Sequence, residues 1–154
     1  MQRGILEGFY GPPWSWDDRV VVMERCIPAG WPWYVWAPKD DPVHREQWRA
    51  PFPAEHLAGF ARLAALPGLR LGVGVSPGLT IDTDSAADRQ ALASKVASAV
   101  DAGAELVMVA LDDIPAGPDA GARHGDLVAG LAALLPDDVT IVVVPTDYTG
   151  VSGT

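Results

Sequence analysis

The chain alternates between short apolar runs and longer stretches with helical periodicity. Five runs are continuously apolar or aromatic, which is typical of strands covered on both faces. They are Gly4–Tyr10, Trp31–Ala37, Leu69–Ser76, Ala104–Leu111 and Val139–Val144. Between them, leucine, valine and alanine recur at roughly helical spacing in Trp16–Ile27, Pro53–Leu66, Ser85–Asp101 and Asp119–Leu135. The alternation predicts consecutive βα units that build a parallel sheet.

Residues that commonly begin and end helices lie at the ends of the predicted helices. Ser15 or Asp17 can cap the first helix, and Asp84 or Ser85 the third. Helix exits are marked by Gly68, Gly103 and Pro136, and Pro53 suits a first helical turn. No linker or low-complexity tract divides the chain, so residues 1–154 are interpreted as one domain.

Polar and aromatic residues gather after the strands, whereas the opposite loops are short turns. The segments that follow the strands are Gly8–Trp14, Pro38–Asp41, Ser76–Gly78, Asp112–Asp113 and Thr146–Tyr148. This asymmetry is typical of the (β/α)8 barrel, whose active site lies at the carboxyl ends of the strands. The rival architecture, a doubly wound sheet, usually carries a glycine-rich phosphate loop after its first strand, and the sequence has none.

The predicted fold is therefore an α/β barrel of the (β/α)8 type with about five of its strands present. A five-stranded arc leaves two strand edges unpaired. We therefore expect the chain to be the amino-terminal part of a longer barrel or an incomplete gene product, and its open edges to allow self-association.

Composition narrows the classes of partner. The chain has 154 residues, of which 49% are hydrophobic and 20% charged, and a net charge of -9, which argues against binding to nucleic acid. Cys26 is the single cysteine, and His44, His56 and His124 lack the spacing of a metal site, so no metal or cofactor is predicted. No apolar stretch approaches the roughly 20 residues of a membrane span. Without a signal-peptide core, the expected location is the cytoplasm.

Two adjacent carboxylates, Asp112 and Asp113, close the fourth apolar run. Two like charges at the end of a buried strand are costly unless a bound partner or a shared proton relieves the repulsion. The pair is therefore predicted to be catalytic. Two alternatives stay open, because the pair could cap the following segment or bind a divalent cation together with Asp40 or Asp41.

Several motifs resemble, in order, the family 84 glycoside hydrolases. These are β-N-acetylglucosaminidases that include protein O-GlcNAcases and hyaluronidase-like enzymes. The motifs are Glu7–Trp14, Tyr34–Pro42 with His44-Arg45 and Trp48-Arg49, Ser76–Leu79, Leu111–Ile114 and Pro145–Tyr148. The resemblance covers nearly the whole chain but only about the first half of the family's catalytic barrel. It implies a substrate that contains N-acetylglucosamine, as a glycan or a glycoprotein.

The Cα atoms of adjacent residues lie only about 3.8 Å apart, too close for two acids to flank a sugar from opposite sides. The resemblance implies substrate-assisted catalysis, in which the 2-acetamido oxygen attacks the anomeric carbon and an oxazoline forms with net retention. Asp112 would orient the acetamido group, and Asp113 would serve as general acid and then base. An inactive truncated paralogue and a sugar-binding module are the alternatives.

Three further residues are implied by the same resemblance. Gly8 would let the backbone approach a sugar hydroxyl, Lys39 would donate hydrogen bonds to sugar hydroxyls, and Tyr148 would line the pocket near the anomeric centre. Asp40 and Asp41 look structural, and we expect them to pair with Arg45 or Arg49.

Overall fold

The computed structural model describes residues 3–113, 117 and 119–146. Five parallel strands form one sheet whose spatial order is the chain order. The strands are β1 (Gly4–Glu7), β2 (Trp33–Trp36), β3 (Arg70–Val75), β4 (Leu106–Ala110) and β5 (Thr140–Val144). A doubly wound sheet would reverse direction at a switch point. The sequential order confirms the predicted partial (β/α) barrel.

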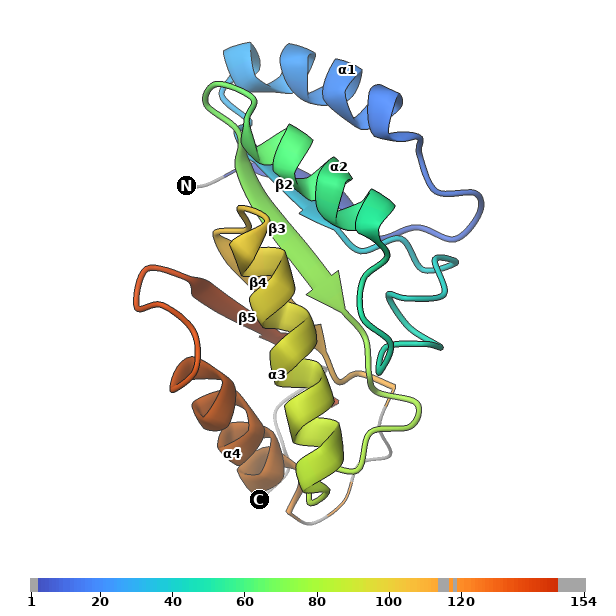
Figure 1. The fold of residues 1–154 in the computed structure, drawn as a ribbon, viewed down its shortest axis with the longest axis vertical. Helices are drawn as coiled ribbons and strands as arrows, with labels where there is room; N and C mark the ends of the chain where they lie inside the picture. The colour runs from blue at the N-terminus through green and yellow to red at the C-terminus, as the bar shows by residue number, and fades with distance from the viewer. Residues whose placement is uncertain (1–2, 114–116, 118, 147–154) are drawn as a thin grey trace, which may run out of the picture.

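Helices fill the intervals between strands as the periodicity predicts (Figure 1). They are α1 (Trp16–Cys26), α2 (Ala54–Ala64), α3 (Ala86–Asp101) and α4 (Ala120–Ala132), with a 3-10 turn η1 (Ile27–Ala29) after α1. Ser15 caps α1 in a capping box with Asp18, and Ser85 accepts a cap hydrogen bond from the Asp88 amide at the start of α3. Gly68 and Gly103 take positive φ angles of 83° and 101°, which suits the turns after α2 and α3.

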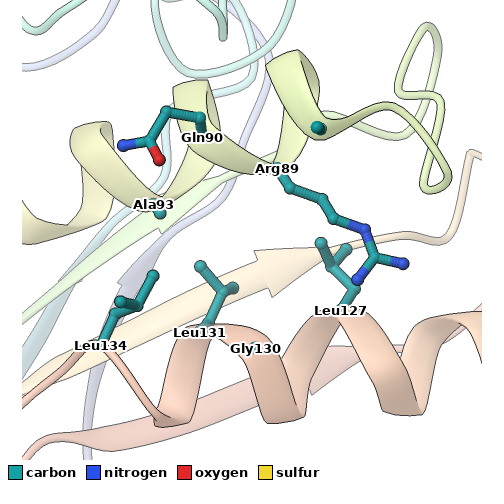
Figure 2. A pocket seen from close by; sticks show the side chains of 8 residues that line it. Arg89, Gln90, Ala93, Leu127, Gly130, Leu131 and Leu134 are labelled. Carbon is teal, nitrogen blue, oxygen red and sulfur yellow. The ribbon is translucent and has the colours of Figure 1, made fainter.

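The four helices bury their apolar sides in one core against the sheet. In Figure 1, α2 and α3 lie in front of β3 and β4. Leu71, Val73 and Val75 of β3 are each at most 1% exposed within this core. Between α3 and α4, Leu131 faces Ala93 and Leu127 faces Arg89 across a groove that contains none of the predicted site residues (Figure 2).

The other face of the sheet is apolar but less covered, which differs from the expectation that both faces are buried. Leu6 is 55% exposed and Val142 is 37% exposed. In a closed barrel, side chains from strands across the barrel fill this face. Gly72 of β3 lies between Val35 and Leu106, and a Cβ there would meet their side chains at 2.9 and 3.0 Å. The sheet is therefore crowded along β3 and open towards its two edges.

Among the described residues, no helix is long and apolar enough to cross a bilayer.

Candidate active site

The carboxyl ends of the parallel strands bring most of the predicted site residues to one edge of the sheet. Gly8 follows β1, Lys39 follows β2, and Asp112 and Asp113 follow β4. Tyr148 lies outside the described residues. The sequence therefore predicts that these residues share the carboxyl edge of the sheet. Hydrogen bonds determine how their side chains are held there.

The acidic pair lies on a turn that is anchored to β5. The Leu111 amide donates to the Val144 carbonyl at 2.8 Å, and the Thr146 hydroxyl donates to the Leu111 carbonyl at 2.8 Å. Asp112 is partly buried, and its Oδ1 atom is fully buried without a hydrogen-bond partner among the described residues. A buried carboxylate oxygen without a donor costs free energy. Asp112 Oδ1 is therefore a candidate acceptor for a donor that the described residues do not supply.

Asp113 has different surroundings from its neighbour. Its Oδ2 accepts a hydrogen bond from Arg45 Nη2 at 2.8 Å, and its side chain is 29% exposed. Gly78, in the loop after β3, packs against it so closely that a Cβ at position 78 would lie 3.2 Å from both Asp113 Cβ and Asp113 N. Gly78 and Arg45 therefore limit where Asp113 can move.

The loop after β1 is held by a buried carboxylate that the sequence interpretation missed. Glu7 is 0% exposed, and Arg19 binds its two oxygens at 2.8 Å each. The Tyr34 hydroxyl and the Trp14 amide also donate to Glu7. Burial, together with the negative charge of Glu7, raises the pKa of Tyr34. The sequence did contain a signal for this role. Glu7 is an acidic residue inside an apolar strand, and a buried acid needs a partner.

Gly8 occupies a position where the fold itself does not demand glycine. A Cβ there would meet only Leu6, at an ordinary contact distance of 3.4 Å or more. Its backbone has none of the positive φ angles that favour glycine. The local structure leaves room beside Gly8 for the backbone approach that the resemblance implies.

The loop after β2 is tied to the loop after β1. The Lys39 amide donates to the Phe9 carbonyl at 3.1 Å, and the Gly11 amide donates to Asp40 Oδ2 at 2.8 Å. Lys39 and Arg45 line a hollow of about 280 Å³ together with Asp40, Asp41, Glu46 and Leu79. The Lys39 ammonium makes no ion pair within the described part of the chain.

The predicted pairing of Asp40 and Asp41 with Arg45 or Arg49 is wrong. Asp41 Oδ2 pairs with His56 Nε2 of α2 at 2.9 Å, because its other oxygen caps the Val43 amide and turns the side chain towards that helix. Arg45 binds Asp113 instead, and Arg49 binds Asp88 of α3 at 2.6 Å. Since Asp40 and Asp41 are committed to Gly11 and His56, the structure does not favour a cation shared with Asp112.

Two buried basic side chains, His44 and Lys95, fasten the rest of this loop to the sheet and to α3. His44 is 0% exposed, its Nδ1 lies 3.0 Å from the Gly74 carbonyl, and its own carbonyl accepts from the Ser76 amide at 2.8 Å. Burial lowers the pKa of His44 to about 4, so this imidazole is neutral near pH 7. Lys95 of α3 donates to the Ala50 carbonyl at 2.8 Å, and burial lowers its pKa to about 8.

A sheet of sequential parallel strands with an acidic pair at its carboxyl edge is typical of part of a (β/α) barrel, the class of fold that this structure defines. Comparison with known proteins gives the family. Residues 3–154 match the beta-N-acetylglucosaminidase family, so the chain belongs to family 84 of the glycoside hydrolases. The family and the relatives found are glycoside hydrolases. The predicted family membership is therefore confirmed.

The most similar curated relatives include the Protein O-GlcNAcases of Rattus norvegicus and Mus musculus. Each is 31% identical over 114 residues, a match that covers 72% of this chain and 12% of the relative. The chain therefore spans about an eighth of the length of these relatives.

Two solved structures share the fold. A mutant form of the O-GlcNAc hydrolase of Thermobaculum terrenum superposes with a TM-score of 0.85 at 28% identity, over 96% of this chain and 35% of that one. The structure of CpGH84B superposes with a TM-score of 0.83 at 29% identity, over 96% of this chain and 27% of that one. The five strands and four helices of the described structure thus have the same architecture as part of a longer relative.

Proposed function

We propose that this chain supplies the acidic pair of a retaining β-N-acetylglucosaminidase that hydrolyses terminal N-acetyl-β-D-glucosaminides with the help of the substrate's acetamido group. The observation that carries the proposal is the buried Oδ1 of Asp112, which has no hydrogen-bond partner among the described residues. An acetamido N–H is a donor that would satisfy it. Membership of the family supports the substrate class.

The two aspartates divide the reaction between them. Asp112 accepts the acetamido N–H, which orients the acetamido oxygen and stabilises the positive charge that develops as this oxygen bonds to the anomeric carbon. The bond to the leaving oxygen breaks, and Asp113 gives that oxygen its proton. Water then opens the oxazoline, Asp113 takes a proton from the water, and the sugar leaves with its original configuration.

Three other residues would bind the sugar in this proposal. Gly8 would accept a close approach of a hydroxyl, which a side chain at this position would obstruct. Lys39 would donate to hydroxyls from the hollow that it lines with Arg45. Tyr148 is proposed from the family motif alone. The substrate would be a glycan or glycoprotein that carries N-acetylglucosamine.

The second candidate is a sugar-binding or inactive chain of the same fold. The chain spans 35% of the solved O-GlcNAc hydrolase, so the contacts made by the rest of that protein are not among these residues. A site that grips the sugar with fewer contacts positions the reacting atoms less well. We therefore expect little or no turnover by the 154-residue chain.

The test is hydrolysis of aryl N-acetyl-β-glucosaminides whose leaving groups differ, starting with the 4-nitrophenyl compound. Asp113→Asn should lower the rate least for the best leaving group, because such a group needs little protonation. Asp112→Asn should lower the rate for every leaving group. Equal losses in both variants would contradict the assigned roles.

The matched control is the 4-nitrophenyl β-glucoside, which lacks the N-acetyl group. The proposal expects no hydrolysis of it, and equal turnover of the two sugars would refute acetamido participation. Binding of N-acetylglucosamine without turnover of either compound would instead support the second candidate.

A further inference from the structure

Arg45 is the cation nearest to Asp113 in the described structure, and its place was not predicted from the sequence. Its Nη2 donates to Asp113 Oδ2 at 2.8 Å, and its Nη1 lies 3.4 Å from the Tyr10 hydroxyl. Arg45 thus joins the loop after β2 to the loop after β1 and to the end of β4. These segments are distant in sequence and meet only at the carboxyl edge of the sheet.

The surroundings of Arg45 fix its guanidinium in place. Its side chain is 19% exposed, and its Nε is buried without a partner among the described residues. A partly buried guanidinium has lost part of its hydration, so a hydrogen bond to a charged acceptor stabilises it more than one to a neutral acceptor. The Asp113 carboxylate supplies that charge.

Arg45 and the acid role of Asp113 compete with each other. A neutral carboxylic acid would lose the ionic part of the pair, so Asp113 cannot both carry a proton and keep the full contact with Arg45. The charged form is the one that accepts a proton from water in the second step of the proposed reaction.

We propose that Arg45 is a positioning residue that holds the Asp113 side chain in place in the empty site. Asp113 then takes a proton from solvent, leaves Arg45, and gives that proton to the departing oxygen. This inference rests on the proposed function for its meaning in catalysis. The contact itself can be tested without turnover.

The experiment is carboxylate labelling of the whole chain with a water-soluble carbodiimide and glycine ethyl ester, read at each aspartate by peptide mass spectrometry. In Arg45→Gln we expect labelling of Asp113 to rise about threefold or more, because its Oδ2 is no longer held by a cation. Arg45→Lys keeps the charge and should restore part of the protection.

Arg49→Gln is the matched control, because Arg49 lies in the same loop and forms an ion pair of similar length with Asp88. It should raise the labelling of Asp88 and leave Asp113 unchanged. Unchanged labelling of Asp113 in Arg45→Gln would overturn the inference. An equal rise at Asp113 in Arg49→Gln would also overturn it, since general loosening of the loop would then explain the result.

Kinetics separate this inference from the proposed function. With measurable wild-type turnover, Arg45→Gln should lower kcat more than it raises KM, whereas Arg49→Gln should leave their ratio unchanged. The two can fail separately. If Arg45 protects Asp113 from labelling but the chain hydrolyses substrates with and without the acetamido group equally well, the proposed function is refuted and the contact between Arg45 and Asp113 is not.

Discussion

Two acidic sites lie at the same edge of the sheet and have opposite surroundings. Glu7, at the end of β1, is fully buried and receives hydrogen bonds from Arg19, Tyr34 and Trp14. Asp112, at the end of β4, keeps a buried oxygen without a partner among the described residues. A satisfied carboxylate stabilises the fold, whereas an unsatisfied one costs stability and would gain from a donor that a ligand supplies. This difference distinguishes the scaffold from the candidate site more clearly than residue type does.

Loss of the Glu7 charge should have the largest effect on stability. Glu7→Gln leaves Arg19 buried without its counter-ion, which costs about 3–5 kcal/mol of unfolding free energy. Urea unfolding followed by circular dichroism measures the change. The double variant Glu7→Gln with Arg19→Met should recover part of the loss, because it removes the stranded charge. A loss below about 1 kcal/mol for Glu7→Gln would contradict the structural role.

Acid should weaken the fold through His44. The folded chain resists protonating this imidazole, whose pKa is lowered to about 4, whereas the unfolded chain binds the proton below its ordinary value of 6.5. Between these values the unfolded state holds more protons, so stability falls as the pH drops, by up to about 3 kcal/mol. Unfolding curves at pH 7 and pH 4.5 test this. An unchanged pH dependence in His44→Gln would exclude His44 as the cause.

Gly78→Ala should have a moderate effect that is concentrated at Asp113. The added Cβ would lie 3.2 Å from Asp113 Cβ and N, so one of the two segments must shift, at a cost of about 1 kcal/mol. Gly125→Ala, on the exposed side of α4 with no atom within 4 Å of the new Cβ, is the matched control and should stabilise by up to about 1 kcal/mol. Thermal unfolding of both variants shows whether each alanine lowers or raises the stability. Stabilisation by both alanines would show that Gly78 does not limit Asp113.

Asp112→Asn should have the smallest effect on unfolding and a large effect on ligand recognition. Because Oδ1 has no partner to lose, the unfolding free energy should change by no more than about 0.5 kcal/mol or should rise. Binding of N-acetylglucosamine, followed by NMR titration, should weaken about tenfold as the charged acceptor is lost. A large loss of stability with unchanged binding would place Asp112 with Glu7 in the scaffold.

Much of the fold was predictable because its signals are local. The continuous apolar runs and the helical spacing identified the five strands and four helices that the structure describes, and Ser15, Ser85, Gly68 and Gly103 marked boundaries. The strands end earlier than the runs do, as at Glu7 rather than Tyr10, because an apolar run can continue into a loop. The expected burial of both faces held for the helix side and not for Leu6 and Val142.

The ion-pair partners of the loop residues were not predictable from the sequence, because several charged residues nearby could each have formed a chemically equivalent pair. Asp41 could have met Arg45, Arg49 or His56, and only the course of the loop brings it to His56. Glu7 was interpreted as part of a strand motif, although burial makes it the centre of a hydrogen-bond network.

The sequence alone determined the order of βα units, the family and the adjacency of Asp112 and Asp113, since periodicity and motif spacing are properties of the chain itself. The tertiary structure decided which carboxylates are satisfied. It brings Arg45 to Asp113 and Arg19 to Glu7, and it leaves one oxygen of Asp112 without a donor in the described structure. The physical reason is that desolvation and hydrogen bonding depend on what surrounds a side chain in space, which residue identity does not specify.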